Sequence, residues 1–263
     1  MTTPAYVEQG SGDTTLVFLH GLGGGHAAWK DQLPYFGTCG YRAVAWDQPG
    51  YGASPMVDPY DFEHVAGGLR RLLEELGGPP AVLVGHSMGG FVAQEAYGRY
   101  PHLVKALVLA FTSPAFGGSG GEFQRQFIAS RIAPLDEGKS MADIAARLMP
   151  TMRGARSKAG GLDHAERVMA NVPAATYRKA VALLTTFDRR ELLPRITVPT
   201  LVLAGADDRT APASVMQRMA QLIPGAEYAV LPDCGHLGPM DQPDEFNQAL
   251  GSFLERRVHR GER

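Results

Sequence analysis

A G-x-S-x-G pentapeptide at residues 85–89 constrains the fold of this chain more than any other feature. The apolar run 81–84 that precedes it is typical of a buried strand, and the run 91–97 that follows it has the spacing of a helix. A strand, a sharp turn and a helix in this order form the turn on which a nucleophilic serine is exposed. We therefore predict that Ser87 lies in a strained turn, and that its flanking glycines keep Cβ atoms out of the tight crossing of strand and helix.

The chain also supplies partners for such a serine. A serine hydroxyl needs a general base, and the base needs a group that orients it. The strand-like run 200–205 is followed by Asp207 and Asp208, and the strand-like run 228–231 is followed by His236. In an open α/β sheet, the carboxyl ends of the strands gather the ligand-binding groups. We therefore expect the acid, the base and the serine to meet at one edge of a sheet.

These pieces together resemble the α/β-hydrolase fold serine hydrolases. The resemblance spans roughly residues 15 to 255, and its motifs lie at residues 20–24, 46–54, 85–89, 205–208 and 235–236. Segments 187–190 and 198–205 look like the branch that holds 3-oxoadipate enol-lactonases and small carboxylesterases. The resemblance implies an α/β fold with a mostly parallel central sheet flanked by helices and an inserted helical cap.

The order of strand-like and helix-like runs predicts the same architecture. Strand candidates lie at residues 16–19, 43–46, 81–84, 106–111, 200–204 and 228–231, with an antiparallel edge strand at 5–8. Residues 113–195 break this alternation, because a glycine-rich loop is followed there only by helix-like runs: 122–132, 141–149, 162–170 and 174–186. We predict a core formed by residues 1–112 and 196–263, and a helical cap formed by 113–195 that covers the site.

The resemblance implies a role for each residue of the site. Ser87 would attack an acyl carbon, and His236 would take its proton and return it to the leaving group. The spacing of Gly205, the aspartate and a later proline favours Asp208 over Asp207 as the acid. The backbone N–H groups of Leu22 and Met88 would form the oxyanion hole.

Other polar and aromatic residues receive narrower predictions. We expect His20 to order the oxyanion loop through hydrogen bonds, and we expect His86 to point away from the substrate because adjacent side chains on a turn diverge. The candidates for the wall of the substrate pocket are Phe116, Phe127, Met149 and Phe187. An enol-lactone of a dicarboxylic acid would need a cation for its free carboxylate, and the candidates are Arg125, Arg131, Arg153, Arg156 and Arg190.

Length and composition argue against several classes of protein. The 263 residues suit one α/β domain with an insertion, and a formal net charge of −2 offers no basic surface for nucleic acid or an anionic membrane. Residues 1–10 carry no signal-like apolar stretch, and no run reaches the ~18 apolar residues of a membrane helix. Two cysteines imply no disulfide framework, which favours a reducing cytoplasm, and Cys234 is expected to be a buried filler. The His and Cys spacing predicts no metal site, and no motif indicates a cofactor.

The leading functional hypothesis is hydrolysis of a small-molecule carboxylic ester or lactone through an acyl-serine intermediate. Relatives with this fold that attack alkyl carbons use an aspartate at the turn, so Ser87 indicates acyl chemistry. Three alternatives stay open. One is hydrolysis of a carbon–carbon bond in a vinylogous diketone, whose enzymes often carry a tryptophan shortly after the histidine, where this chain has Leu237. The others are cofactor-free perhydrolysis and a ligand receptor that retains the catalytic residues.

Overall fold

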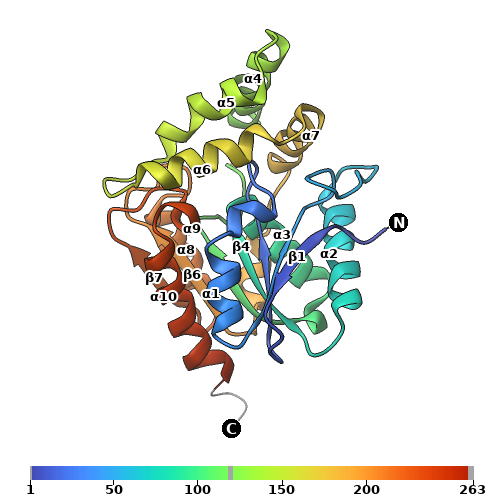
Figure 1. Ribbon diagram of the computed structural model, residues 1–263, viewed down its shortest axis with the longest axis vertical. Coiled ribbons are helices and arrows are strands. Elements are labelled where there is room, and N and C mark those ends of the chain that lie inside the picture. Colours follow the sequence, from blue (N-terminus) through green and yellow to red (C-terminus); the bar gives the residue numbers. More distant parts are fainter. Residues whose placement is uncertain (1, 118–120, 260–263) are drawn as a thin grey trace.

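The computed structural model describes residues 2–117 and 121–259. Its strands are β1 (Tyr6–Gln9), β2 (Thr15–Leu19), β3 (Arg42–Trp46), β4 (Ala81–His86), β5 (Val104–Ala110), β6 (Thr200–Gly205) and β7 (Glu227–Leu231). They form one sheet in the order β1-β3-β2-β4-β5-β6-β7 (Figure 1). The edge strand β1 runs antiparallel to β3, and the other neighbours run parallel. The predicted mostly parallel sheet with an antiparallel edge strand is confirmed.

Two layers of helices cover the sheet, and the apolar strands explain why both faces need covering. Strands β2, β4 and β6 are buried along their whole length, as expected for a parallel sheet whose two faces are both packed. Helices α1 (Gln32–Thr38) and α10 (Pro243–Phe253) pack side by side, and α2 (Phe62–Leu76) packs beside α3 (Met88–Arg99). The remaining helices of the sheet-bearing part are η1 (His26–Trp29), η2 (Pro101–Leu103), α8 (Ala213–Leu222), α9 (Gly238–Asp241) and η5 (Leu254–His259).

Between β5 and β6 the chain forms a group of helices instead of a strand. We call four of them the cap helices: α4 (Glu122–Asp136), α5 (Met141–Leu148), α6 (Ala159–Ala170) and α7 (Ala174–Leu184). Two short helices lie in the same segment of the chain, η3 (Met149–Met152) and η4 (Arg190–Arg195). The cap helices are α4 to α7 throughout. They lie together beyond one end of the sheet (Figure 1). The four predicted helical runs are confirmed to within a few residues, and the glycine-rich loop falls partly outside the described residues. The division into core and cap at 113–195 remains a proposal. None of the described helices combines the length and the apolar character needed to cross a membrane.

The strand order places two loops of the predicted site side by side. From β2 the chain moves outward to β3, then returns to the other side of β2 to form β4. Because β2 and β4 are parallel neighbours, with Leu19 opposite Gly85, their carboxyl ends lie next to each other. A crevice opens at such a reversal of strand order, and the loop 20–25 and the turn at Ser87 both lie there.

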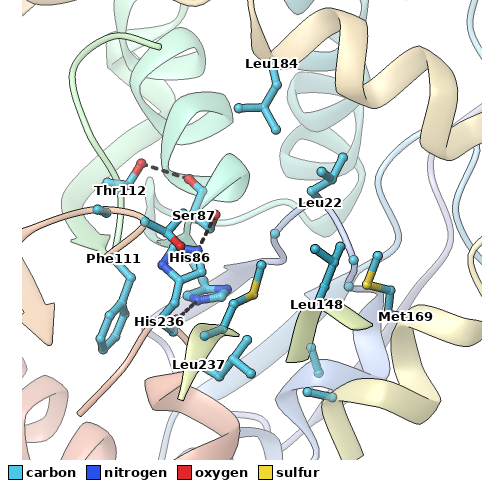
Figure 2. A pocket seen from close by; sticks show the side chains of 18 of the residues that line it. Leu22, His86, Ser87, Phe111, Thr112, Leu148, Met169, Leu184, His236 and Leu237 are labelled. Carbon is cyan, nitrogen blue, oxygen red and sulfur yellow. Dashed lines mark hydrogen bonds between the residues drawn. The ribbon is translucent and has the colours of Figure 1, made fainter. Parts of the chain in front are cut away.

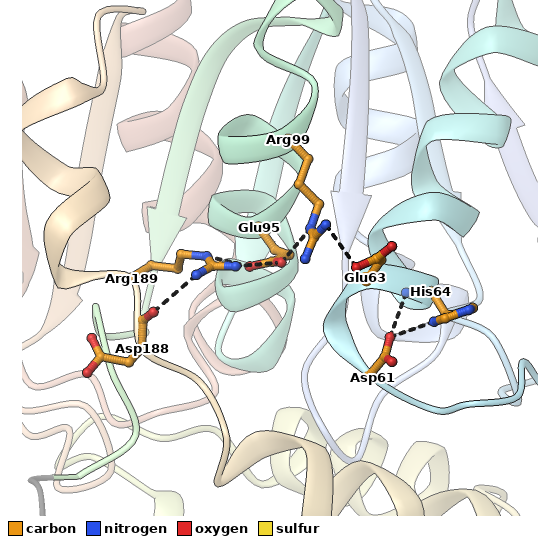
Figure 3. A network of polar contacts seen from close by, with 7 residues as sticks. All are labelled: Asp61, Glu63, His64, Glu95, Arg99, Asp188 and Arg189. Atoms are coloured by element: carbon orange, nitrogen blue, oxygen red, sulfur yellow. Dashed lines mark hydrogen bonds and ion pairs between the residues drawn. The ribbon is translucent and has the colours of Figure 1, made fainter.

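An ion-pair network around one buried carboxylate ties the cap helices back to the sheet-bearing part of the chain. Glu95 on α3 is 1 % exposed, and its carboxylate pairs with Arg99 at 2.7 Å and with Arg189 at 2.6 Å. Arg99 also reaches Glu63 on α2 at 3.2 Å (Figure 3). We call Glu63, Glu95, Arg99 and Arg189 the Glu95 network. Since Arg189 lies just after α7, this network holds the segment that returns from the cap helices against α3.

Candidate active site

The serine turn has the strained backbone that the sequence predicts. Ser87 has φ 53° and ψ −118°, a backbone conformation that residues other than glycine rarely adopt. A Cβ atom on Gly85 would lie 2.5 Å from the carbonyl oxygen of Gly89, and one on Gly89 would lie 2.0 Å from the carbonyl oxygen of Leu19. The two glycines therefore permit the close crossing of β2, β4 and α3 around the serine.

The end of β5 holds this turn on both sides. The N–H of Ser87 donates to the carbonyl of Ala110 at 3.0 Å, and the hydroxyl of Thr112 donates to the carbonyl of Ser87 at 2.8 Å (Figure 2). Strain in one residue persists only when its surroundings fix it, and these two bonds do so. Thr112 is thus a supporting residue that the sequence analysis did not identify.

The three side chains predicted to act together form one hydrogen-bonded line. The hydroxyl oxygen Oγ of Ser87 lies 2.9 Å from Nε2 of His236 (Figure 2). Nδ1 of His236 lies 2.8 Å from Oδ2 of Asp208. His236 and Asp208 are both buried. With Nδ1–H donating to the carboxylate, Nε2 is left to accept the serine proton, which is the arrangement that general-base activation requires.

Backbone donors complete the environment of the Asp208 carboxylate. Its Oδ1 accepts hydrogen bonds from the N–H groups of Thr210 at 2.7 Å and Ala211 at 3.0 Å. Burial acts to raise the pKa of Asp208, but His236 and these two N–H groups outweigh it and hold the pKa below its ordinary value. The neighbouring Asp207 points elsewhere, because its Oδ2 accepts a hydrogen bond from the N–H of Ala155 at 2.8 Å.

His86 does not point away from the site as the sequence analysis expected. Its side chain lines the same cavity as Ser87, and its Nε2–H donates to the carbonyl of His236 at 2.7 Å (Figure 2). Burial, and then the nearby His236, lower the pKa of His86 to about 3, so the ring is neutral near pH 7. The prediction missed this position because His86 is the last residue of β4, and its side chain packs under the loop that carries His236.

Phe111 is a further part of the site that the sequence analysis assigned only to a strand. It follows β5 with φ 50°, and its ring meets the rings of His86 and His236 edge-on, at centroid distances of 5.7 and 6.4 Å. A Cβ atom on Gly238 would lie 2.2 Å from the tip of the Phe111 ring. The ring is therefore wedged against the loop that carries His236, and no local pattern in the sequence indicates this contact.

The loop after β2 is fixed next to the serine turn. Nδ1–H of His20 donates to the carbonyl of Gly21 at 2.8 Å, and Nε2 accepts from the N–H of Gln48 at 3.0 Å, so the predicted ordering of this loop by His20 is confirmed. Burial lowers the pKa of His20 to about 4. A Cβ atom on Gly21 would lie 3.1 Å from Cβ of Ser87, and the Tyr51 hydroxyl donates to the carbonyl of Leu22 at 2.9 Å.

The two residues whose N–H groups are predicted as oxyanion donors lie on the loop after β2 and at the start of α3. Leu22 lines the cavity on this fixed loop. Met88 is the first residue of α3, so its N–H has no carbonyl partner within the helix, and the positive end of the helix dipole lies there.

A mostly apolar cavity of about 140 Å³ opens above Ser87. Its wall contains three of the four predicted pocket residues, namely Phe116, Phe127 and Met149; other apolar members are Leu22, Phe91, Phe111, Leu148, Met152, Met169, Leu184, Leu237 and Met240. Phe187 does not line it, because its ring stacks on Phe91 at a centroid distance of 4.0 Å, one layer behind the wall. Figure 2 shows how Leu148, Met169 and Leu184 surround the space beside Ser87.

Two groups at the cap side of the cavity are polar. Of the five arginines considered for a substrate carboxylate, Arg131 on α4 is the one that lines this cavity, and Tyr177 on α7 lines it too.

Cys234 is buried as predicted, and burial raises the pKa of its thiol to about 12, so it is not a competing nucleophile. Within residues 2–117 and 121–259 there is no group of three or more His, Cys, Asp or Glu side chains placed to hold a metal ion.

Comparison with known proteins gives a consistent result. A family model described as alpha/beta hydrolase fold matches residues 14–243. The chain is 33% identical over 248 residues to "Putative carbamate hydrolase RutD" of Stutzerimonas stutzeri, covering 91% of each chain. It is 31% identical to a 2-hydroxy-6-oxononadienedioate/2-hydroxy-6-oxononatrienedioate hydrolase of Paraburkholderia phymatum, covering 95% of this chain and 90% of the relative. A malate-bound thermophilic esterase from Thermogutta terrifontis superimposes with a TM-score of 0.85 at 28% identity, covering 96% and 93% of the two chains.

Proposed function

The chain belongs to the alpha/beta hydrolase fold family, and on that premise we propose that it is a serine hydrolase that cleaves a carboxylic ester or lactone through an acyl-serine intermediate. The observation that supports this most strongly is the hydrogen-bonded line from Ser87 Oγ through His236 to Asp208, with distances of 2.9 and 2.8 Å. The line ends at a cavity whose wall is mostly apolar, as expected for a small-molecule substrate.

The first half-reaction transfers the acyl group to the enzyme. Nε2 of His236 accepts the proton of Ser87 as Oγ attacks the acyl carbon, and the Asp208 carboxylate stabilises the imidazolium that forms. Collapse of the tetrahedral intermediate breaks the bond to the alcohol oxygen, and His236 protonates that oxygen. In a lactone the released alcohol stays attached to the acyl group. Water then attacks the acyl-serine with His236 again as the base, releasing the carboxylic acid and restoring Ser87.

The oxyanion of each tetrahedral intermediate needs donors already in position. We assign this role to the backbone N–H groups of Leu22 and Met88, on the loop after β2 and at the start of α3. One such donor typically contributes about 3 kcal/mol of transition-state stabilisation. Since His20 and Tyr51 hold the backbone of this loop, they are positioning residues in this scheme.

Carbon–carbon hydrolysis is the second candidate. It is supported by the name of the Paraburkholderia relative, which is 31% identical over most of its length. The same nucleophile could serve both reactions, so the substrates must separate them. Turnover of simple acyl esters favours the esterase proposal, while turnover of only a vinylogous 1,5-diketone would favour the second candidate.

We also propose that the protein acts on a small molecule in the cytoplasm and that neither nucleic acid nor a membrane is its partner. The formal net charge of −2 supports the absence of nucleic acid and of an anionic membrane as partners, because it offers no basic surface for either. Cys39 and Cys234 are both free thiols, which is consistent with a reducing compartment. Fractionation of the native host and a test for co-purifying nucleic acid check this proposal.

Steady-state hydrolysis of p-nitrophenyl esters of increasing acyl length tests the central proposal. The wild type should turn over esters whose acyl chain fits the cavity, and Ser87→Ala should lower kcat by about 10⁴- to 10⁶-fold. Thr112→Ser, which keeps the hydroxyl that bonds the turn, is a matched control and should retain most activity. Equal activity in wild type and Ser87→Ala would reject the assignment of Ser87 as nucleophile.

A further inference from the structure

The backbone of His236, the base in the proposed chemistry, is held from two sides. On one side, Nε2–H of His86 at the end of β4 donates to the carbonyl of His236 at 2.7 Å. On the other side, the N–H of His236 donates to the carbonyl of Met152 at 2.8 Å. Met152 ends η3 and begins the stretch that leads into α6, residues 152–158, which we call the clamp segment. Because both the N–H and the C=O of His236 are bonded, its ring has little freedom to move away from Ser87.

The clamp segment contacts the loop that carries His236 at backbone distance, and two glycines permit this. A Cβ atom on Gly154 would lie 2.4 Å from the carbonyl oxygen of Asp233 and 2.4 Å from the nitrogen of Gly235. A Cβ atom on Gly235 would lie 2.6 Å from the nitrogen of Gly154. The N–H of Arg156 also donates to the carbonyl of Asp233 at 3.1 Å. A shift of the clamp segment would therefore displace the loop directly.

Asp241 holds the clamp segment in this place. It is fully buried on α9, the short helix that follows the loop of His236. Its Oδ1 accepts a hydrogen bond from the N–H of Lys158 at 2.7 Å, and its Oδ2 accepts one from the hydroxyl of Ser157. The same hydroxyl oxygen accepts from the N–H of Gly154 at 2.9 Å. A chain of hydrogen bonds thus runs from Asp241 through Ser157 to the glycine that contacts the loop.

The start of α6 suits the negative charge of Asp241. Lys158 is the N-cap residue of α6, and its own side chain makes no capping hydrogen bond. The first N–H groups of a helix need acceptors, and the positive end of the helix dipole lies there. Asp241 supplies such an acceptor from another element, since α6 packs against α9 (Figure 1). Burial of a carboxylate is costly unless its charge is compensated, so this contact fixes how α6 sits on α9.

The other side-chain contacts of the clamp segment lie at the surface. The N–H of Ala155 donates to the exposed carboxylate of Asp207. Arg156, whose side chain is 55 % exposed, reaches Glu245 only at 3.5 Å. Exposed charges contribute little to such contacts because water screens them. The buried carboxylate of Asp241 is therefore the contact on which the place of the clamp segment depends most.

We propose that Asp241 is a positioning residue for His236. It fixes the clamp segment, and the clamp segment fixes the backbone of the base. His236 is then aligned with Ser87 only while α6 is docked on α9. This inference rests on the role of His236 as general base in the proposed function. It adds that the stretch between η3 and α6 aligns this base. A misplacement of about 1 Å in a reacting group can lower the rate by about 100-fold.

The first test measures kcat and KM separately, on a p-nitrophenyl ester that the wild type hydrolyses. Asp241→Asn keeps the size of the side chain but loses its charge, and should lower kcat by about 10- to 100-fold with KM within about threefold. Ser157→Ala should lower kcat by about 3- to 10-fold. The double variant should lose no more than about what Asp241→Asn loses, because both changes break one chain of hydrogen bonds.

Two controls separate positioning from folding. Values of kcat are normalised to the number of sites that diethyl p-nitrophenyl phosphate titrates, so unfolded protein does not count. Asp244→Asn is the matched variant, since Asp244 is an exposed aspartate at the start of α10, and it should keep kcat within about twofold of wild type. A wild-type kcat per titrated site in Asp241→Asn would overturn the positioning role, even if less of the variant were folded.

A spectroscopic measurement separates this inference from the proposed function. In a Ser87→Ala background, the proton between Nδ1 of His236 and Asp208 should give a far-downfield NMR resonance, identified by its loss in His236→Gln. Adding Asp241→Asn should shift this resonance or broaden it by exchange with water, while adding Asp244→Asn should leave it unchanged. A changed resonance supports the positioning role even if no ester is hydrolysed. An unchanged resonance together with Ser87-dependent hydrolysis would reject that role and leave the esterase proposal standing.

Discussion

Two buried carboxylates of this protein, Asp208 and Glu95, have partners of opposite kinds. Asp208 pairs with an imidazole, whose charge can change within a catalytic cycle, and with two backbone N–H groups. Glu95 pairs with two guanidinium groups, whose charge does not change in proteins (Figure 3). The first arrangement can respond to a proton that moves, and the second can only hold two segments together. A buried carboxylate therefore indicates a catalytic role only where the charge of its partner can change.

The two regions also differ in how their polar atoms are satisfied. In the Glu95 network, both carboxylate oxygens and both arginines take part in ion pairs between α2, α3 and the segment after α7. In the cavity, the hydroxyl of Tyr177 has no partner within the described residues, and no carboxylate among them lines the cavity wall. A complete network indicates a structural tie, while an incomplete one indicates room for a ligand.

The largest expected effect comes from removing the charge of Asp208. Asp208→Asn should lower kcat by about 10³- to 10⁴-fold, equivalent to about 4–5.5 kcal/mol, because the amide no longer fixes the tautomer of His236 or stabilises its cation. Ester hydrolysis under saturating substrate measures it. Asp207→Asn is the neighbouring control and should change kcat by less than about threefold, since Asp207 bonds the N–H of Ala155 instead. Similar losses in both variants would remove the distinction between the two aspartates.

A smaller effect, on stability instead of rate, is expected in the Glu95 network. Glu95→Gln should lower the free energy of unfolding by about 1–3 kcal/mol, because Arg99 and Arg189 lose their shared counter-charge but remain about a third exposed to water. Urea denaturation measures the free energy, and kcat of the folded variant should stay within about tenfold of wild type. A loss of kcat as large as that of Asp208→Asn would show that the two regions are not functionally distinct.

Acid should destabilise the protein through His86, which lies beside the catalytic histidine. His86 is neutral in the folded state down to about pH 3, while an unfolded histidine takes a proton near pH 6.5, so the unfolded state binds more protons between these values. Stability therefore rises with pH through this window and falls on acidification. His86→Gln should reduce the slope of unfolding free energy against pH by up to about 1.4 kcal/mol per unit between pH 4 and 6.

The control for this slope is His102→Gln. His102 is exposed, so its ring contacts water in the folded and the unfolded states alike. The variant should keep the wild-type slope in the same titration of urea midpoints. A slope unchanged by His86→Gln would mean that His86 is not held neutral by burial beside His236.

The smallest expected effect is at Tyr177. Tyr177→Phe should leave the free energy of unfolding unchanged or raise it by up to about 1 kcal/mol, because it removes a buried hydroxyl that has no protein partner. Tyr51→Phe is the matched change and should cost about 1 kcal/mol, because it breaks the hydrogen bond to the carbonyl of Leu22. Thermal unfolding of both variants, side by side, measures the contrast, and equal losses would mean that Tyr177 is satisfied in the folded protein.

Local signals explain how much of this site could be predicted from the sequence. The strand–turn–helix around Ser87 and the loops that carry Asp208 and His236 are set by residues close in the chain, so their patterns are visible without a structure. The contacts of His86 with the His236 carbonyl, and of Phe111 with both histidines, join residues far apart in sequence. The spacing of apolar residues along the chain carries no information about such contacts.

The wall of the cavity shows the same limit. Phe127 and Phe187 are both aromatic residues in the predicted cap, yet one lines the cavity and the other stacks behind Phe91. Five arginines were equivalent in sequence, and only the packing of α4 over the cavity distinguishes Arg131. Which face of a cap helix turns inward depends on its docking, which a single sequence does not encode in any short pattern.

Covalent trapping of the nucleophile tests the central claim most directly. Diethyl p-nitrophenyl phosphate should react with the wild type to give one diethylphosphoryl group per chain, with release of p-nitrophenolate, and peptide mass spectrometry should locate it on Ser87. Ser87→Ala should take up none, and Asp208→Asn should react far more slowly. A wild type that hydrolyses esters but carries the group on another residue, or a Ser87→Ala protein that is labelled as fast as wild type, would contradict the account.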